Sequence, residues 1–182
     1  MKPILQVEDD PNDVFLLQHA LTKAGVENPI QVATDGQQAI DYLKGTGKFA
    51  DRESFPLPCL VLLDLKLPYV MGLDVLKWIR QRPGAVVIVI LLTASAEDAD
   101  IAAAYRLGAN AFLTKPSKSS KLVDMAKAIK EFWLTLNIPP PDSRENAVAT
   151  ALTHGSPREL PEKRLADPRQ TTRETFLNTA SI

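Results

Sequence analysis

Short apolar segments alternate with amphipathic segments along the first 137 residues. Two of the apolar segments, residues 59–63 and 86–92, contain no polar residue, which is typical of strands buried on both faces of a parallel sheet. Three shorter segments occupy residues 4–7, 30–33 and 111–113. Strand and helix thus alternate five times, and we predict an α/β fold: a doubly wound, five-stranded parallel sheet of the flavodoxin-like type, with helices on both faces.

The segments between the strands carry apolar residues at helical spacing. We predict helices from Pro11 to about residue 24, around residues 39–43 and 75–79, and over about 97–107 and 119–136. Asp10 is the predicted N-cap of the first helix, and Gly25 and Gly108 end the first and fourth helices. Residues 44–58 form a predicted loop, whose length favours a role in function or partner contact.

The last predicted helix carries more apolar residues than one buried face needs. Its predicted core stripe is Leu122, Ala126, Ile129, Trp133 and Leu136, whereas Val123, Met125 and Phe132 lie outside it. The preceding helix adds Ile101 and Tyr105. Because an apolar patch usually marks an interface, we predict a homodimer through the face of the last two helices. The competing interpretation is that the C-terminal tail covers this patch.

Polar residues stand at the ends of four predicted strands. Glu8 and Asp9 follow the first strand, Asp64 the third, Thr93 the fourth and Lys115 the fifth. Taken alone, a strand-end aspartate is best explained as a turn or capping residue. However, the C-terminal ends of parallel strands open on one edge of the sheet, where ligands bind in such folds. We therefore expect three carboxylates, one hydroxyl and one ammonium group to converge at that edge.

This set of side chains suits phosphoryl transfer. Three carboxylates favour a hard cation such as Mg²⁺, which prefers oxygen ligands, and adjacent carboxylates repel each other without one. Asp64 would attack phosphorus as a nucleophile and form an acyl phosphate. Lys115 offers a positive charge and Thr93 a hydroxyl to the phosphoryl oxygens. The sequence indicates no second base or catalytic histidine, so an enzyme with multiple turnovers is not suggested.

Over residues 1 to about 137 the chain resembles a response-regulator receiver domain of two-component signalling. The segments that carry the resemblance are VEDDP at 7–11, LDLKLP at 63–68 with Gly72, LTA at 92–94 and FLTKP at 112–116. They occur in the family's order and spacing, at predicted strand ends. The long loop before Asp64 and the extended last helix are most similar to small stand-alone regulators paired with bacterial phytochrome-type histidine kinases.

The resemblance implies a metal site and a modified residue. Glu8 and Asp9 correspond to the acidic pair of the family, and Asp64 to its phosphoacceptor. The acidic pair, Asp64 and the backbone carbonyl of Lys66 would bind Mg²⁺. The implied function is that of a response regulator which a sensor histidine kinase phosphorylates on Asp64, and which signals through protein contacts.

The resemblance also implies switch residues. Thr93 and Phe112 would be the switch pair, and Lys115 the lysine that contacts the phosphoryl group. Phosphorylation would draw the Thr93 hydroxyl inward and let Phe112 enter the vacated space. Lys66 departs from the family, which usually carries a smaller polar residue there. Either Lys66 is a solvated side chain that contributes only its carbonyl, or its ammonium crowds the attacking water or the metal and alters the lifetime of the phosphorylated state.

Two other classes of function compete with a receiver. A Mg²⁺-dependent phosphohydrolase would also use Asp64 as nucleophile, as the haloacid-dehalogenase-type phosphatases do. Those enzymes need a second acid two residues later, where this chain has Lys66. An inert receiver-like scaffold is disfavoured by the complete acidic set. We therefore expect no enzyme activity beyond catalysis of the protein's own phosphorylation and dephosphorylation.

Composition narrows the classes of partner. The chain has 182 residues, 45% of them hydrophobic, and a formal net charge of −1, so no polyanion or acidic membrane surface is indicated as a partner. The single cysteine, Cys59, excludes an intramolecular disulfide and suits a reducing cytoplasm. The sequence shows no signal-peptide pattern and no apolar run long enough to span a bilayer. We predict a cytoplasmic protein.

The C-terminal part of the chain has a different composition. We predict a receiver domain over residues 1–137 and a Pro-rich tail over 138–182 that is disordered. The tail has no basic stripe or recognition-helix pattern, so we expect no DNA-binding output domain. A docking segment for one partner is the alternative interpretation of the tail. The sequence leaves open the kinase, the stimulus, the downstream target and the lifetime of the phosphorylated form.

Overall fold

The chain folds around one parallel sheet. The structure, a computed structural model, describes residues 1–82, 87–94 and 97–139. The strand order is β2-β1-β3-β4-β5, and every pairing is parallel. The strands are β1 (Ile4–Val7), β2 (Ile30–Ala33), β3 (Leu60–Asp64), β4 (Ile88–Thr93) and β5 (Ala111–Thr114). The helices are α1 (Pro11–Lys23), α2 (Gly36–Lys44), α3 (Gly72–Arg80), α4 (Asp98–Arg106) and α5 (Ser119–Ile129). The predicted flavodoxin-like fold is confirmed.

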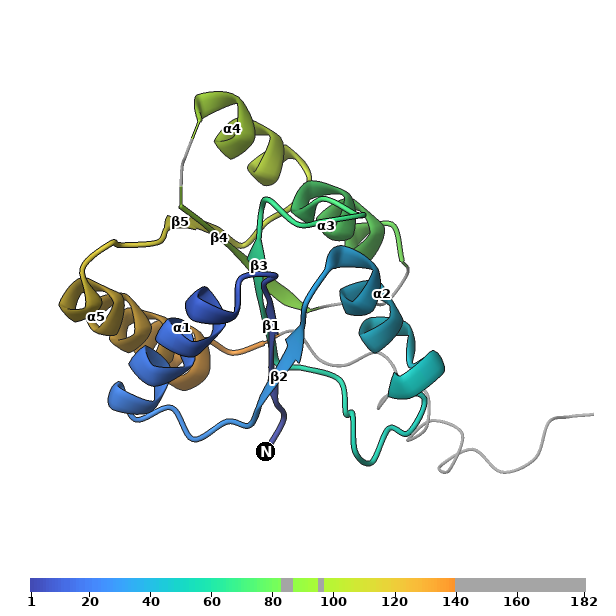
Figure 1. Ribbon diagram of the computed structural model, residues 1–182, viewed down its shortest axis with the longest axis horizontal. Helices are drawn as coiled ribbons and strands as arrows, with labels where there is room; N and C mark the ends of the chain where they lie inside the picture. Colours follow the sequence, from blue (N-terminus) through green and yellow to red (C-terminus); the bar gives the residue numbers. More distant parts are fainter. Residues whose placement is uncertain (83–86, 95–96, 140–182) are drawn as a thin grey trace, which may run out of the picture.

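The sheet is the middle of three layers (Figure 1). Helices α1 and α5 cover one face, and α2, α3 and α4 cover the other. In β4, the side chains of Ile88, Ile90 and Leu92 pack towards α1 and α5. Val89 and Leu91 pack into the opposite core. Because β3 and β4 are covered on both sides, neither strand has a solvent-facing position for a polar residue, which explains their apolar sequences.

The ends of the first helix follow from local sequence. The Asp10 carboxylate accepts a hydrogen bond from the Asn12 backbone N–H at 2.7 Å, and Pro11 occupies the first turn. Both features satisfy or remove N–H groups that have no partner inside the helix. Gly25 follows the helix at φ +75°, a conformation that glycine adopts without steric cost. The predicted start and end of α1 are confirmed.

The last helix departs from the prediction in its final turns. After α5, residues Lys130–Leu136 (η2) form a π-helix, in which each residue turns through a smaller angle than in an α-helix. The apolar stripe is therefore displaced, and Leu134 packs partly against the core. Leu136, predicted to face the core, is 63% exposed, so that prediction was wrong. The other four stripe positions are buried or half-buried, as predicted: Leu122, Ala126, Ile129 and Trp133.

The connection between α2 and β3 is held by its own side chains. It contains a short 3₁₀ helix, η1 (Gly47–Phe49). The rings of Tyr42, Phe49 and Phe55 meet edge to face, with centroids 5.2 to 6.1 Å apart. The Arg52 guanidinium donates to the carbonyls of Tyr42 and Leu43 at the C-terminal end of α2, where a positive charge is favourable. The predicted loop thus packs as a structural unit against the core.

Two further predictions concern residues that lie partly outside the described parts of the chain. Strand β4 begins at Ile88, two residues after the predicted start at residue 86, which lies outside the described part. Of the predicted tail, only Ile138 and Pro139 are described. None of the helices within residues 1–82, 87–94 and 97–139 is long and apolar enough to cross a membrane.

Candidate functional site

The parallel register brings the predicted site residues to one edge of the sheet. Asp64, the last residue of β3, pairs with Leu92 of β4. The Glu8 N–H continues the sheet past β1 by donating to the Ala33 carbonyl at 3.0 Å. The Lys115 N–H does the same after β5, at 2.7 Å from the Thr93 carbonyl. Since the backbone is hydrogen-bonded up to these positions, the side chains are held by the sheet itself.

Three carboxylates form a tight cluster at this edge. One oxygen from each of Glu8, Asp9 and Asp64 lies within 4.8 Å of the others. The Glu8 and Asp64 residues are buried, with 4% and 8% of their surface exposed, whereas Asp9 is exposed. An all-oxygen set with one side open to solvent fits a divalent cation of the Mg²⁺ type, which keeps some of its waters.

The Lys115 ammonium lies among the carboxylates. It donates to Glu8, and its Nζ lies 3.0 Å from Asp13 Oδ2 and 3.6 Å from Asp64 Oδ1. Nothing in the local sequence predicts the contact with Asp13, which lies in the first turn of α1. With Asp9, which lies beside Glu8 and Asp64, the cluster holds four carboxylates and one ammonium. The cluster therefore carries an excess of negative charge that favours a cation.

The pKa values follow from burial and from this charge excess. Burial raises the pKa of Glu8 and of Asp64 above their ordinary values, although Lys115 opposes the rise in both. Burial alone would lower the pKa of Lys115. Its hydrogen bonds with Glu8 and Asp13 and the charge of Asp64 outweigh this effect, so the pKa of Lys115 is raised. All three shifts favour the protonated form of the group.

The predicted switch residues share one face of the sheet. Thr93 is buried, with 1% of its surface exposed. Phe112 pairs with Leu91 in the register of β4 and β5, two residues before the pair formed by Thr93 and Thr114. Because side chains alternate along a strand, Phe112 and Thr93 point to the same side, and Phe112 packs half-buried against the core under α2, α3 and α4.

The loop that follows Asp64 packs too closely for side chains at two positions. A Cβ atom on Gly72 would lie 2.1 Å from the Asp64 carbonyl oxygen, and one on Gly36 would lie 2.0 Å from the Val70 carbonyl oxygen. The Gly72 N–H also donates to the Leu65 carbonyl at 3.0 Å. These two glycines thus hold residues 65–72 against the end of β3, while the Lys66 side chain is exposed.

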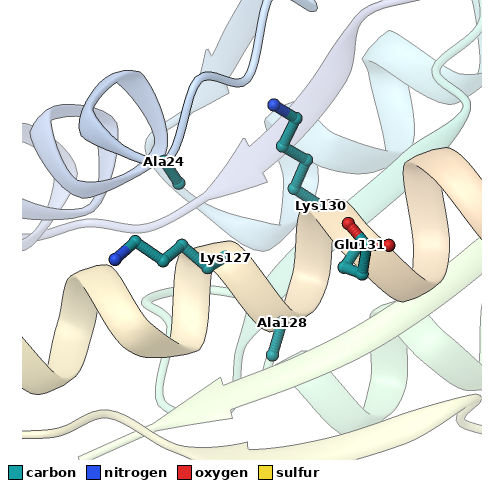
Figure 2. A pocket seen from close by; sticks show the side chains of 5 residues that line it. All are labelled: Ala24, Lys127, Ala128, Lys130 and Glu131. Carbon is teal, nitrogen blue, oxygen red and sulfur yellow. The ribbon is translucent and has the colours of Figure 1, made fainter.

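A surface pocket lies at the far end of α1. It has a volume of about 420 Å³ and is lined by Ala24, Lys127, Ala128, Lys130 and Glu131. Figure 2 shows the side chains of Lys127 on α5 and of Lys130 at the start of η2. Since α1 has 13 residues, it is about 20 Å long, and the acidic cluster adjoins its other end. The pocket is therefore separate from the cluster.

Residues 4–127 match the response regulator receiver domain. The chain belongs to this family. It is 37% identical over 140 residues to response regulator Rcp1 of Synechocystis sp., a match that covers 76% of this chain and 93% of that protein. The crystal structure of Mn²⁺-bound Rcp1 is similar with a TM-score of 0.70 and 35% identity, covering 78% of this chain and all of the other. The phosphorylated cyanobacterial phytochrome response regulator RcpA is similar with a TM-score of 0.71 and 35% identity, covering 77% and 99%.

Membership of the family establishes the class of function. The chain carries a receiver domain of two-component signalling, homologous to response regulators that become phosphorylated. Such proteins have histidine kinases as partners and are generally signalling proteins, not enzymes. The cluster of Glu8, Asp9 and Asp64 is an acidic site of the kind that binds Mg²⁺ or Mn²⁺.

Proposed function

We propose that Asp64 accepts a phosphoryl group from the phosphohistidine of a sensor histidine kinase. The observation that carries this proposal is the position of Asp64 at the end of β3, inside the acidic cluster and 3.6 Å from the Lys115 ammonium. A phytochrome-type kinase is the proposed donor, supported by the similarity to RcpA. The single free cysteine, Cys59, is consistent with a cytoplasmic location, which we also propose.

The proposed transfer is a single displacement at phosphorus. A bond forms between an Asp64 carboxylate oxygen and phosphorus, while the bond between phosphorus and the donor imidazole breaks. The imidazole nitrogen keeps the electron pair and takes up a proton. The Lys115 ammonium pairs with one phosphoryl oxygen, and the Thr93 hydroxyl donates to another. In the later dephosphorylation, water would attack phosphorus while the bond to the Asp64 oxygen breaks, which releases inorganic phosphate and restores the carboxylate. Lys115 and Thr93 would pair with the phosphoryl oxygens in this step as well.

Glu8, Asp9, Asp64 and the backbone carbonyl of Lys66 would hold Mg²⁺. The ion, when bound, neutralises charge on the transferring phosphoryl group. Asp9 is the ligand open to solvent, so it gives access to the ion, whereas the buried carboxylate of Glu8 positions Lys115. The test is incubation of the protein with Mg²⁺ and acetyl phosphate, followed by intact mass. Addition of one phosphoryl group that requires Mg²⁺ supports the proposal, and an unmodified chain refutes it.

Lys66 is the proposed determinant of the lifetime of the phosphorylated state. The Lys66 residue is exposed and stands two residues after Asp64, where its ammonium would crowd the water that attacks the phosphoryl group. We expect Lys66→Asn to shorten the half-life of the phosphorylated chain several-fold, because water then approaches phosphorus more freely. The measurement is the decay of the phosphorylated mass after the donor is removed. Lys77→Asn, an exposed lysine on α3, is the control, and an equal half-life in all three proteins contradicts the proposal.

The switch and the homodimer are proposed to be coupled. Thr93 and Phe112 share a face of the sheet, which supports a concerted movement when Thr93 turns towards the phosphoryl group. Tyr105 on α4 and Phe132 after α5 are each 53% exposed, which supports an apolar contact about a two-fold axis. We expect sedimentation to detect a dimer whose affinity differs between the phosphorylated and unphosphorylated chain. Monomers in both states, and in a chain that ends near Pro139, would exclude it.

A further inference from the structure

The loop after Asp64 contains an unusual backbone conformation. Tyr69 has φ +63° and is the only residue other than glycine with positive φ in the described parts of the chain. The Val70 N–H donates to the Pro68 carbonyl at 2.7 Å, a hydrogen bond across three residues that places Tyr69 at the centre of a γ-turn. At positive φ this turn is rare and strained, and a large aromatic residue is poorly suited to it.

Packing within the described chain does not explain why a tyrosine stands there. The Tyr69 residue is 91% exposed, the largest exposed fraction among the large apolar and aromatic residues that the structure describes. Its neighbour Met71 is 47% exposed as well. A strained conformation that holds an aromatic ring in solvent, beside a functional site, is a feature that a bound partner would use.

The loop is also fixed in place. The hydrogen bond from Gly72 to Leu65 closes it beside the end of β3, and the close contact between Gly36 and the Val70 carbonyl leaves no room for movement towards α2. The backbone at Tyr69 is therefore held in place, five residues after Asp64. A tyrosine side chain has few rotatable bonds and loses little conformational entropy on binding, and tyrosine is common among the residues that dominate interfaces.

The proposed phosphorylation of Asp64 indicates which partner would contact this loop. An imidazole side chain is short, so a phosphohistidine can reach Asp64 only if the protein that carries it lies directly over the site. Two pairs of exposed apolar residues follow the acidic residues in the sequence. Phe15 and Leu16 on α1 are 65% and 42% exposed, and Tyr69 and Met71 lie in the loop after Asp64. A protein domain that covers Asp64 meets the loop as well as α1.

The geometry points to Tyr69 as a contact that selects the kinase: its ring packs against the kinase domain that presents the phosphohistidine. This inference rests on the proposed phosphorylation of Asp64. Small phosphodonors need no such contact, because they enter the site without a protein surface around them. Loss of the ring should therefore affect transfer from the kinase and spare labelling by acetyl phosphate.

The test compares the two donors on one set of variants. The protein donor is a phytochrome-type histidine kinase, labelled on its histidine and selected as the one that transfers fastest to the wild-type chain. Tyr69→Asn removes the ring but tolerates positive φ, and we expect it to lower kcat/KM for transfer from the kinase by about tenfold or more. Tyr69→Phe keeps the ring and should transfer at the wild-type rate. Ile138→Asn removes an exposed apolar side chain after the last helix and should also leave transfer unchanged.

Each outcome decides the inference. Slow transfer from the kinase with normal labelling by acetyl phosphate, and rescue by Tyr69→Phe, supports it. Normal transfer from the kinase to Tyr69→Asn overturns it. Equal slowing with both donors also overturns it, because Tyr69 would then act on the geometry of the site. If acetyl phosphate fails to label the wild-type chain on Asp64, the proposed function itself is wrong, so the two failures are distinguishable.

Discussion

Asp64→Asn is expected to abolish phosphorylation by acetyl phosphate and by the kinase, and to leave the fold intact. The amide has nearly the same shape as the carboxylate but is not a nucleophile. The fold should tolerate the change because burial raises the pKa of Asp64. For a carboxyl group with a raised pKa, ionisation costs stability, and this cost grows as the pH rises through the folded-state pKa. A neutral amide avoids that cost at pH 7.

Intact mass after incubation with Mg²⁺ and acetyl phosphate measures this result, and thermal unfolding checks the fold. Asp10→Asn is the matched control, since it makes the same chemical change one residue from the acidic pair. Asp10 serves as the exposed N-cap of α1, and asparagine caps helices as well as aspartate does. This variant should be labelled like the wild-type protein. Full labelling of Asp64→Asn would place the acceptor at another residue.

Lys115→Met is expected to destabilise the folded protein by about 3–5 kcal/mol at pH 7, the usual effect of removing one partner from a buried ion pair. The side chains of Lys115, Glu8 and Asp64 are only 14%, 5% and 10% exposed, so solvent screens their interactions weakly. Without the ammonium, the carboxylates of Glu8, Asp13 and Asp64 face one another uncompensated. The variant should also lose most phosphoryl transfer, because no cation of the chain pairs with the phosphoryl oxygens.

The loss of stability in Lys115→Met should depend on pH. Burial already raises the pKa of Glu8 and Asp64 in the folded protein, and Lys115 opposes that rise. Its removal therefore raises both pKa values further. Below the unfolded-state values of 4.5 and 3.8, both groups are protonated and need no cation, so the two proteins should have similar stability. The difference should widen as the pH rises through the folded-state pKa values.

Urea unfolding at a series of pH values measures this effect. Lys121→Met is the control, because Lys121 forms an exposed ion pair with Asp124 at 3.5 Å. Exposed pairs contribute little, so this variant should unfold like the wild-type protein at every pH. A constant difference between Lys115→Met and wild type from acid to neutral pH would show that lost packing, and not the carboxylates, causes the destabilisation.

The sequence alone determined the order of strands and helices and the residues at the sheet edge. Buried parallel strands must be apolar, so a polar residue such as Asp64 can stand only where a strand leaves the core. The Asp10 cap and the glycine after α1 are likewise local, because they depend on backbone groups a few residues away. The receiver motifs combine these local signals, which is why the amino-acid pattern was sufficient to identify the family.

Only the tertiary structure decided the contacts between distant segments. Asp13 and Lys115 are 102 residues apart, and nothing in the first turn of α1 distinguishes a solvated aspartate from one that meets the sheet edge. The exposure of Leu136 depends on the π-helix after α5, which changes the rotation per residue that any stripe analysis assumes. The strained position of Tyr69 arises because Gly36 and Gly72 confine the loop from both sides. In each case the conformation is determined by packing between helices, strands and loops that are distant in the sequence. A sequence pattern reflects only the interactions within a single helix or strand.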